Sequence, residues 1–345
     1  MSFSTLPAPF TSSYDNSKWV GIGGIVGYCH SVNRACTIEN SVNMGSVTFR
    51  GSIDGCYNCY LYLGGIAGYL YSSGYNSTVK NCANYGDLTH SGWRNFTHIG
   101  GIVGASGSSS GNMYIYNCLN HGTITHSGTT GSSLDLGGIV GHTRLTTIEN
   151  CVSGGKFSLL ANASDDYTGS IVGYIESKTI ISYTYYTSDL SDYDKYGNGT
   201  LSSESNTFSY DSTTFELDGT VSIESYTGSS LLGALNAYAG YNITLDYSHW
   251  LLNKENKTVS FTINGRTNPI KMDYKIILLP SLASDEGMGF DGWYSNKECT
   301  VLFEKTIVEE DIALYGRYGS EPSTAPSLFP HATLLLSFLI SLIAF

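Results

Sequence analysis

A five-residue phrase that recurs along the N-terminal half of the chain limits what the chain can fold into. The phrase is GGIVG or a close variant, and its copies begin at Gly23, Gly64, Gly100, Gly137 and Gly169, at intervals of 32–41 residues. A single unit of ~36 residues cannot bury its own apolar face, whereas stacked units share one continuous core. The repeat therefore predicts a fold built by stacking.

A second phrase follows each copy of the first after a variable gap. It reads IENSVNMG, VKNCANYG, IYNCLNHG and IENCVSGG in the first four units and is degraded to IISYTYYT in the fifth. The segments between phrases are short and rich in Ser, Gly, Asn and Tyr, which is typical of strands joined by turns. A phosphate-binding glycine loop would lead into an amphipathic helix, and no copy has that sequel, so the glycines predict structure rather than nucleotide binding.

The aligned copies predict an all-β chain whose main part is a β-solenoid of about five repeats. Equivalent strands should pair from one repeat to the next, and the isoleucines of the first phrase should form one inward row. These are Ile25, Ile66, Ile102, Ile139 and Ile171. The glycines on either side fit corners that need a positive φ or a close backbone approach.

Other aligned positions predict further rows. Stacked asparagines, which can hydrogen-bond along the coil axis, are Asn40, Asn81, Asn117 and Asn150 at one position and Asn43, Asn84 and Asn120 at another. Aligned cysteines, Cys82, Cys118 and Cys151, should be small packing residues. His90 and His126 lie in echoed THSG phrases, and we expect them to stack on a solvated loop.

Two parts of the chain resemble known families. The paired phrases GGIVG and I-x-N-C-x-N-x-G, over about residues 19–188, resemble the GLUG-type repeats of bacterial and protist surface proteins. The segment FDGWYSNKECTVLFEKTIVEEDIALYGRY, Phe290 to Tyr318, resembles the Listeria–Bacteroides (internalin B-type) repeat, although Arg317-Tyr318 stands where that family more often ends in Trp. The second resemblance implies a small β module with earlier strands at 259–264 and 275–279 and with Trp293 in its core.

The resulting organisation has five parts. We expect an N-terminal remnant at 1–18, the repeat β-solenoid at 19–188, a linker or cap at 189–258, the β-rich module at 259–318 and a hydrophobic anchor signal at 319–345. The linker should contain a short helix over Ser229–Gly240, because serine N-cap candidates precede Leu231 and Leu235 at helical spacing. That helix is expected to cap the open end of the solenoid.

The two ends of the chain bear on location. The C-terminal segment has small residues at Gly319, Ser320 and Ser323, a Pro-rich spacer and an uncharged run over 332–345, which fits a GPI-attachment signal; a single membrane-spanning helix is the alternative. The first ten residues lack the pattern of a secretory signal peptide, so we expect a truncated N-terminus.

Secretion would expose several modification sites. N-glycosylation sequons stand at Asn76, Asn95, Asn162, Asn198, Asn242 and Asn256. In an oxidising compartment Cys29 with Cys36, and Cys56 with Cys59, are close enough to form local disulfides.

Charge and motifs exclude some functions and favour one class. A net charge of −12, from 17 Lys plus Arg against 29 Asp plus Glu, excludes nucleic-acid binding. We find no catalytic motif and expect no catalytic residue, metal or cofactor. The sequence predicts a membrane-anchored cell-surface protein for adhesion or coat structure, which binds glycans or proteins of another cell or host surface. The alternative is a non-catalytic arm or degenerate member of a glycan-processing or protease-associated β-helix protein.

Overall fold

The computed structural model describes residues 2–3, 17–32, 34–50, 58–127, 129–159, 166–190, 192–224, 226–242, 245–263, 269–281 and 289–319. The chain is mostly β, with parallel sheets, which confirms the all-β prediction. It divides into two compact units: the first holds the repeats up to Ser212, and the second holds most of the chain after Thr220.

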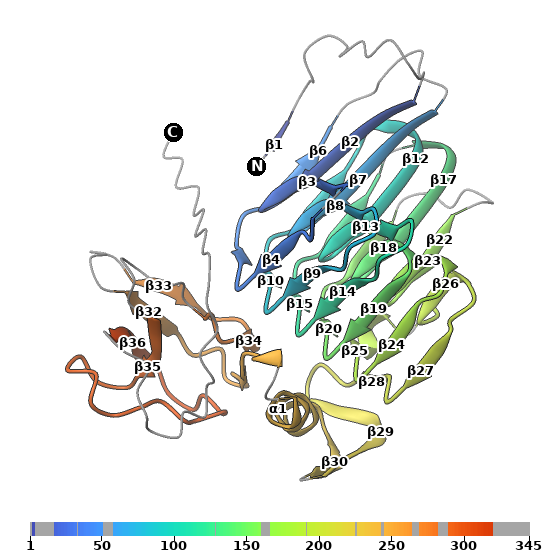
Figure 1. Cartoon of the computed structure of the whole chain (residues 1–345). Helices are drawn as coiled ribbons and strands as arrows, with labels where there is room; N and C mark the ends of the chain where they lie inside the picture. The colour runs from blue at the N-terminus through green and yellow to red at the C-terminus, as the bar shows by residue number, and fades with distance from the viewer. Residues whose placement is uncertain are drawn as a thin grey trace. The chain divides into compact units, whose positions relative to one another are not determined.

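In the repeat unit, equivalent strands of successive repeats pair in parallel and form five sheets, numbered here I to V in chain order (Figure 1). Sheet I contains β2 (Ser17–Gly23), β7 (Asn58–Gly64), β12 (Trp93–Gly100), β17 (Thr129–Gly137) and β22 (Tyr167–Gly169). Sheet II contains β3 (Val26–Ser31), β8 (Ala67–Ser72), β13 (Val103–Ser108), β18 (Val140–Arg144), β23 (Val172–Ser177) and β26 (Tyr196–Gly199).

The second phrase of each repeat forms the strands of the next two sheets. Sheet III contains β4 (Thr37–Glu39), β9 (Ser77–Lys80), β14 (Met113–Tyr116), β19 (Thr146–Glu149), β24 (Ile180–Ser182) and β27 (Ser203–Ser205). Sheet IV contains β5 (Val42–Asn43), β10 (Ala83–Asn84), β15 (Leu119–Asn120), β20 (Val152–Ser153), β25 (Tyr185–Thr187) and β28 (Phe208–Tyr210). Sheet V contains β1 (Ser2–Phe3), β6 (Val47–Phe49), β11 (Leu88–His90), β16 (Ile124–His126) and β21 (Phe157–Leu159).

The predicted isoleucine row lies in the larger of two apolar cores of this unit. Ile66, Ile102, Ile139 and Ile171 are fully buried there, and Ile25, in the first repeat, is partly buried against the same core. A second core lies between sheets I and V and contains Leu61, Ile99 and Leu136 among others. The row is therefore confirmed, with less burial at its first member.

The two asparagine ladders are also present. In the first, the side-chain amides of Asn81, Asn117 and Asn150 each donate to the side-chain oxygen one repeat earlier, at 2.8–3.0 Å. In the second, Asn43 donates to Asn84 at 2.7 Å and Asn84 donates to Asn120 at 2.9 Å.

At the corners, the residues with a positive φ are asparagines and not the glycines of the first phrase. The first-ladder asparagines have φ of 50–53°, a region that Asn tolerates better than most residues. The glycines of the first phrase are needed for close approach instead: a Cβ on Gly64 would lie 1.9 Å from the carbonyl oxygen of Ala67.

Parallel pairing continues beyond residue 188, where the sequence repeats were expected to end. β26, β27 and β28 pair with β23, β24 and β25, after a short 3-10 helix over Ser188–Leu190. Gly197 occupies the place of the last glycine in the first phrase, but Lys195 replaces its isoleucine. The linker predicted from residue 189 therefore begins with three strands that continue the parallel pairing of the repeats but lack their aliphatic pattern.

The second unit contains part of β29 (Glu216–Ile223), β30 (Tyr226–Ser230), α1 (Leu231–Tyr241), a β31–β34 pair (Trp250–Leu252 and Ile276–Leu278) and a four-stranded sheet. That sheet is ordered β33 (Ile270–Met272), β32 (Val259–Ile263), β36 (Ile312–Gly319) and β35 (Gly289–Tyr294). The Ser230 side chain caps α1 by accepting from the Gly233 amide, so the predicted helix is confirmed.

Trp293 belongs to the core of the second unit, as predicted. It is 4% exposed, packs edge-on against Phe261 at 4.9 Å and donates from Nε1 to the Pro280 carbonyl at 2.6 Å. Arg317, at the position where the resemblance is looser, pairs with Asp291 and lies over the Tyr294 ring at 4.4 Å.

Candidate functional site

The turn formed by the GGIxG phrase brings a strand of sheet I close to a strand of sheet II in every coil. Two residues before each copy of the phrase and one residue after it, positions on the two strands lie opposite each other, as where the rings of Tyr62 and Tyr69 stack with centroids 4.4 Å apart. We call this row of side chains the wedge. Its members are Gly21, Tyr62, His98, Asp135 and Tyr167 on sheet I and Tyr28, Tyr69, Ala105, His142 and Tyr174 on sheet II.

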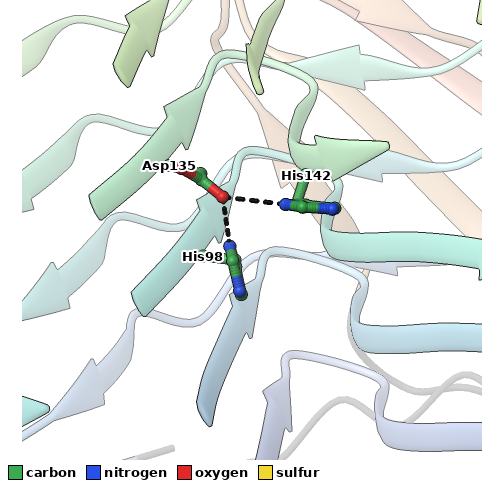
Figure 2. Close-up of side chains that lie close together, drawn as sticks. All are labelled: His98, Asp135 and His142. Carbon is green, nitrogen blue, oxygen red and sulfur yellow. Dashed lines mark hydrogen bonds and ion pairs between the residues drawn. The ribbon is translucent and has the colours of Figure 1, made fainter. Parts of the chain in front are cut away.

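Three charged or titratable side chains meet in the middle of the wedge. One carboxylate oxygen of Asp135, Oδ2, lies 2.6 Å from Nδ1 of His98 and 2.8 Å from Nδ1 of His142 (Figure 2). The side chains of His98 and Asp135 are 7% and 4% exposed, and that of His142 is 23% exposed. The group is therefore shielded from water except along the His142 ring.

Two further residues extend this contact towards solvent. Nε2 of His142 lies 3.3 Å from Oε2 of Glu176, and Oε1 of Glu176 accepts from Arg144 at 3.1 Å. His142 is thus held between two carboxylates, one buried and one half exposed.

The two imidazoles have pKa values shifted in opposite directions. Burial lowers the pKa of His98, and the nearby Asp135 only partly offsets it. Burial also acts to lower the pKa of His142, but hydrogen bonds to Asp135 and Glu176 outweigh it and raise that pKa to about 9. A neutral His98 and a protonated His142 can both donate to Asp135, which accounts for two short contacts to one oxygen.

The carboxylates respond to these partners. Burial acts to raise the pKa of Asp135, but the charges and hydrogen bonds of His98 and His142 prevail and lower it. The hydrogen bond from His142 is the main cause that lowers the pKa of Glu176. Both carboxylates are therefore ionised at neutral pH, on either side of His142.

His98, Asp135 and His142 also form a donor set that could hold a metal ion. Their ligand atoms, one per residue, lie within 4.8 Å of one another. Two imidazole nitrogens and one carboxylate oxygen are a common first shell for Zn²⁺ and other divalent transition metals.

Sequence reasoning missed this group because its members lie in different repeats. His98 and Asp135 occupy the position that Tyr62 and Tyr167 hold in neighbouring coils, and His142 replaces an aromatic on the facing strand. A comparison of the residues two places before and one place after each GGIxG copy would have shown the change from aromatic to titratable side chains.

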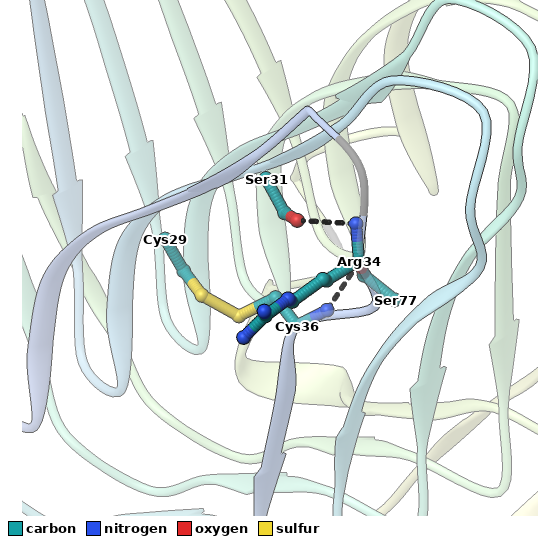
Figure 3. The surroundings of a disulfide bond; sticks show 5 residues. All are labelled: Cys29, Ser31, Arg34, Cys36 and Ser77. Carbon is teal, nitrogen blue, oxygen red and sulfur yellow. Dashed lines mark hydrogen bonds between the residues drawn. A yellow bond between two sulfur atoms is a disulfide. The ribbon is translucent and has the colours of Figure 1, made fainter.

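Of the two local disulfides predicted from the sequence, the first is confirmed. Cys29 and Cys36 are bonded to each other, and the Cys36 amide donates to Ser77 Oγ at 2.9 Å (Figure 3). Cys56 lies outside the described residues.

The histidines and cysteines of the other rows are internal. His90 and His126 are 0% and 1% exposed with their Nδ1 atoms 2.8 Å apart, so the expectation of a solvated loop is wrong, although the two rings do stack. They point inward because the THSG phrase continues a strand of sheet V in which alternate residues face the core. The predicted packing role of Cys82, Cys118 and Cys151 is confirmed, since all three are free and fully buried.

The modification sites predicted from sequence are spread over the chain. Asn76, Asn198 and Asn256 are exposed, Asn242 is the half-buried C-cap of α1, and Asn95 lies in β12. Asn162, Ser320 and Ser323 lie outside the described residues, whereas Gly319 ends β36.

The expected anchor segment, 332–345, also lies outside the described residues. Within the described ranges, no helix has the length and apolar character needed to cross a membrane.

No family model matches the chain, and neither does any curated protein or solved structure.

Proposed function

We propose that the chain is a cell-surface, non-catalytic protein for adhesion or coat structure, with a β-solenoid as its main part. The parallel pairing of equivalent strands from one repeat to the next, in five sheets, supports the solenoid. The resemblance to GLUG-type repeats and to the Listeria–Bacteroides repeat supports a surface location. Attachment to a membrane would be made by the C-terminal segment, through a GPI anchor or a single helix.

The observation that carries the proposed function is a repeated outer face on sheet III. Isoleucine and valine point inward from its strands in the first five repeats, so the residues between them face away from the core. One outer row contains Thr37, Thr78, Tyr114 and Thr147, and the next contains Glu39, Lys80, Tyr116 and Glu149. The rings of Tyr114 and Tyr116 lie 5.2 Å apart.

Such a face suits many weak contacts rather than one tight contact. Tyrosine rings and hydroxyls can pack on and hydrogen-bond to sugars or polar protein surfaces, at little cost in side-chain entropy. Repetition along the stack lets neighbouring coils bind neighbouring units of a polymeric partner, which multiplies the affinity through effective concentration. We therefore expect glycans or coat proteins of another cell as partners.

A glycan array tests this function. The full chain clustered on beads should bind a subset of glycans, and a monomeric form should bind the same glycans far more weakly. Replacing Tyr114 and Tyr116 together by Ser should reduce binding, whereas the matched control Tyr75→Ser, at an exposed tyrosine in a turn, should not. Equal binding by both variants would place the contact elsewhere, and absence of all binding would leave a purely structural coat protein.

The rival function is that of a glycan-processing or protease-associated β-helix protein, in a degenerate or non-catalytic form. The His98, Asp135 and His142 group is the observation in its favour, because adjacent coils bring these residues together. Turnover of a polysaccharide or peptide that is abolished by Asp135→Asn would overturn the non-catalytic proposal and indicate an active member of that class of protein.

A further inference from the structure

We propose that His98, Asp135 and His142 bind one divalent transition-metal ion, and that Zn²⁺ is the ion their donor atoms fit best. This inference is independent of the adhesion proposal, because the three residues lie in the wedge and not on the outer face of sheet III. It assigns a site that the sequence did not predict.

The donor atoms are of the right kind and are already gathered. Nδ1 of His98 and Nδ1 of His142 converge on Oδ2 of Asp135 at 2.6 and 2.8 Å. Zn²⁺ bound by three protein side chains keeps a fourth position for water or another ligand, and nitrogen donors with one carboxylate are a frequent combination. The same donors would also accept Co²⁺, Ni²⁺ or Cu²⁺, which provides probes for the site.

The backbone fixes the three ligands from adjacent coils. His98 in β12 is paired directly with Asp135 in β17, and His142 follows Asp135 across the GGIxG turn in β18. Because parallel pairing sets the register, these Cα positions cannot drift apart without breaking the sheets. A site built on strands in this way is more rigid than one built on loops.

The residues around the ligands hold them in a suitable orientation. Glu176 Oε2, 3.3 Å from Nε2 of His142, leaves Nδ1 of that ring directed at Asp135, and Arg144 in turn binds Glu176. A carboxylate behind a metal-binding imidazole fixes the ring and raises its basicity. The His98 ring is held by Tyr62, whose ring stacks on it at 5.4 Å.

The electrostatic environment also favours a cation. The ionised carboxylates of Asp135 and Glu176 face His142 from opposite sides, so the site requires positive charge between them. A proton on His142 can supply one unit of that charge, and a divalent ion in place of the proton supplies two.

The wedge position beside the ligands in the third repeat is held by a small residue. Ala105 faces His98 at a wedge position that is Tyr69 in the coil before and His142 in the coil after, and Gly107 follows two residues later. The His142 side chain is 23% exposed and gives an ion a route from solvent that the more buried His98 and Asp135 lack.

Metal titration of the untagged full-length chain tests the site, with Zn²⁺ competing against a chromogenic chelator and Co²⁺ followed by its visible spectrum. A Cys299→Ser background removes the one free cysteine of the described residues that is not buried. We expect one ion per chain, with affinity reduced by at least ~10-fold in His142→Gln and Asp135→Asn. Glu176→Gln, at a side chain that is 44% exposed, should fold normally and should weaken binding by ~10-fold.

His30→Asn is the matched control, because His30 is another imidazole of sheet II but lies against Tyr71 in the first two coils. It should bind as the unchanged chain does. Far-ultraviolet circular dichroism shows whether the ligand variants fold. If they do not, the Co²⁺ spectrum of the unchanged chain and the Glu176→Gln titration still decide whether the site binds a metal ion. No saturable binding by the unchanged chain, or equal binding by His142→Gln, Glu176→Gln and the control, would overturn the proposal and leave an ion-pair network.

Discussion

Replacement of Asn117 separates two contributions of the first asparagine ladder to stability, the side-chain hydrogen bonds and the tolerance of a left-handed φ. Asn117 donates to Asn81 at 2.8 Å, accepts from Asn150 at 2.8 Å and has a φ of 50°. Each side-chain hydrogen bond contributes about 1 kcal/mol net, and a left-handed φ costs alanine about 1 kcal/mol more than it costs asparagine or glycine, which both tolerate this region. Asn117→Ala should therefore lower the free energy of unfolding by about 3 kcal/mol, and Asn117→Gly by about 2 kcal/mol.

The matched control is Asn40→Gly, in the first repeat of the ladder. Asn40 has almost the same φ, 52°, but takes part in one ladder hydrogen bond instead of two, so its loss should cost about 1 kcal/mol. Urea unfolding followed by far-ultraviolet circular dichroism measures all three variants. If Asn117→Ala and Asn117→Gly lose the same free energy of unfolding, the proposed cost of a left-handed φ in alanine is refuted. If Asn117→Gly and Asn40→Gly lose the same free energy, the two ladder hydrogen bonds of Asn117 do not add.

Three further predictions concern the core, the wedge and the anchor. Ile102→Asp should lower the free energy of unfolding by several kcal/mol, measured by urea titration, because it places an unpaired charge in a fully buried row. With metal removed by a chelator, His142, whose pKa is raised to about 9, contributes stability that is complete below ~6.5 and is lost as pH rises through 9. The melting temperature should therefore fall over that interval, and His142→Gln should abolish the fall; an unchanged fall would refute this assignment. A reporter fused to residues 188–345 behind a signal peptide should reach the cell surface and be released by phosphatidylinositol-specific phospholipase. Retention after that treatment, together with loss on deletion of 332–345, would indicate a membrane-spanning helix.

The sequence predicts the stacking well because stacking depends on features that recur. Ile66, Ile102 and Ile139 are buried for the same reason in each coil, and equal spacing from the glycine phrase shows their equivalence. The asparagine ladder follows from the same alignment. The strands after residue 188 were missed because Lys195 and Tyr196 replace the aliphatic pair of the phrase. Backbone pairing continues there, but the pattern of side chains does not reveal it.

The candidate site could not be derived from the repeats because it depends on departures from them. His98 and Asp135 are 37 residues apart in sequence and become neighbours only through the register of β12 and β17. Within each coil they look like isolated substitutions of a polar residue for an aromatic one. Whether such substitutions form a site depends on which of them become neighbours in adjacent repeats, and the pairing of the strands decides that.

The parallel register of sheets I to V determines how the repeat unit responds to mechanical load. Strand hydrogen bonds run from coil to coil, so tension along the stacking axis acts on the interfaces between coils in series. If the load enters through the C-terminal end of the unit, the first interface to open joins β26, β27 and β28 to the coil before them, where the aliphatic core has been lost. Stretching one molecule should then give a weak initial rupture followed by stronger ones as force reaches the isoleucine-filled coils. The interface made by β26, β27 and β28 would therefore open at a lower force than the other interfaces of the repeat unit.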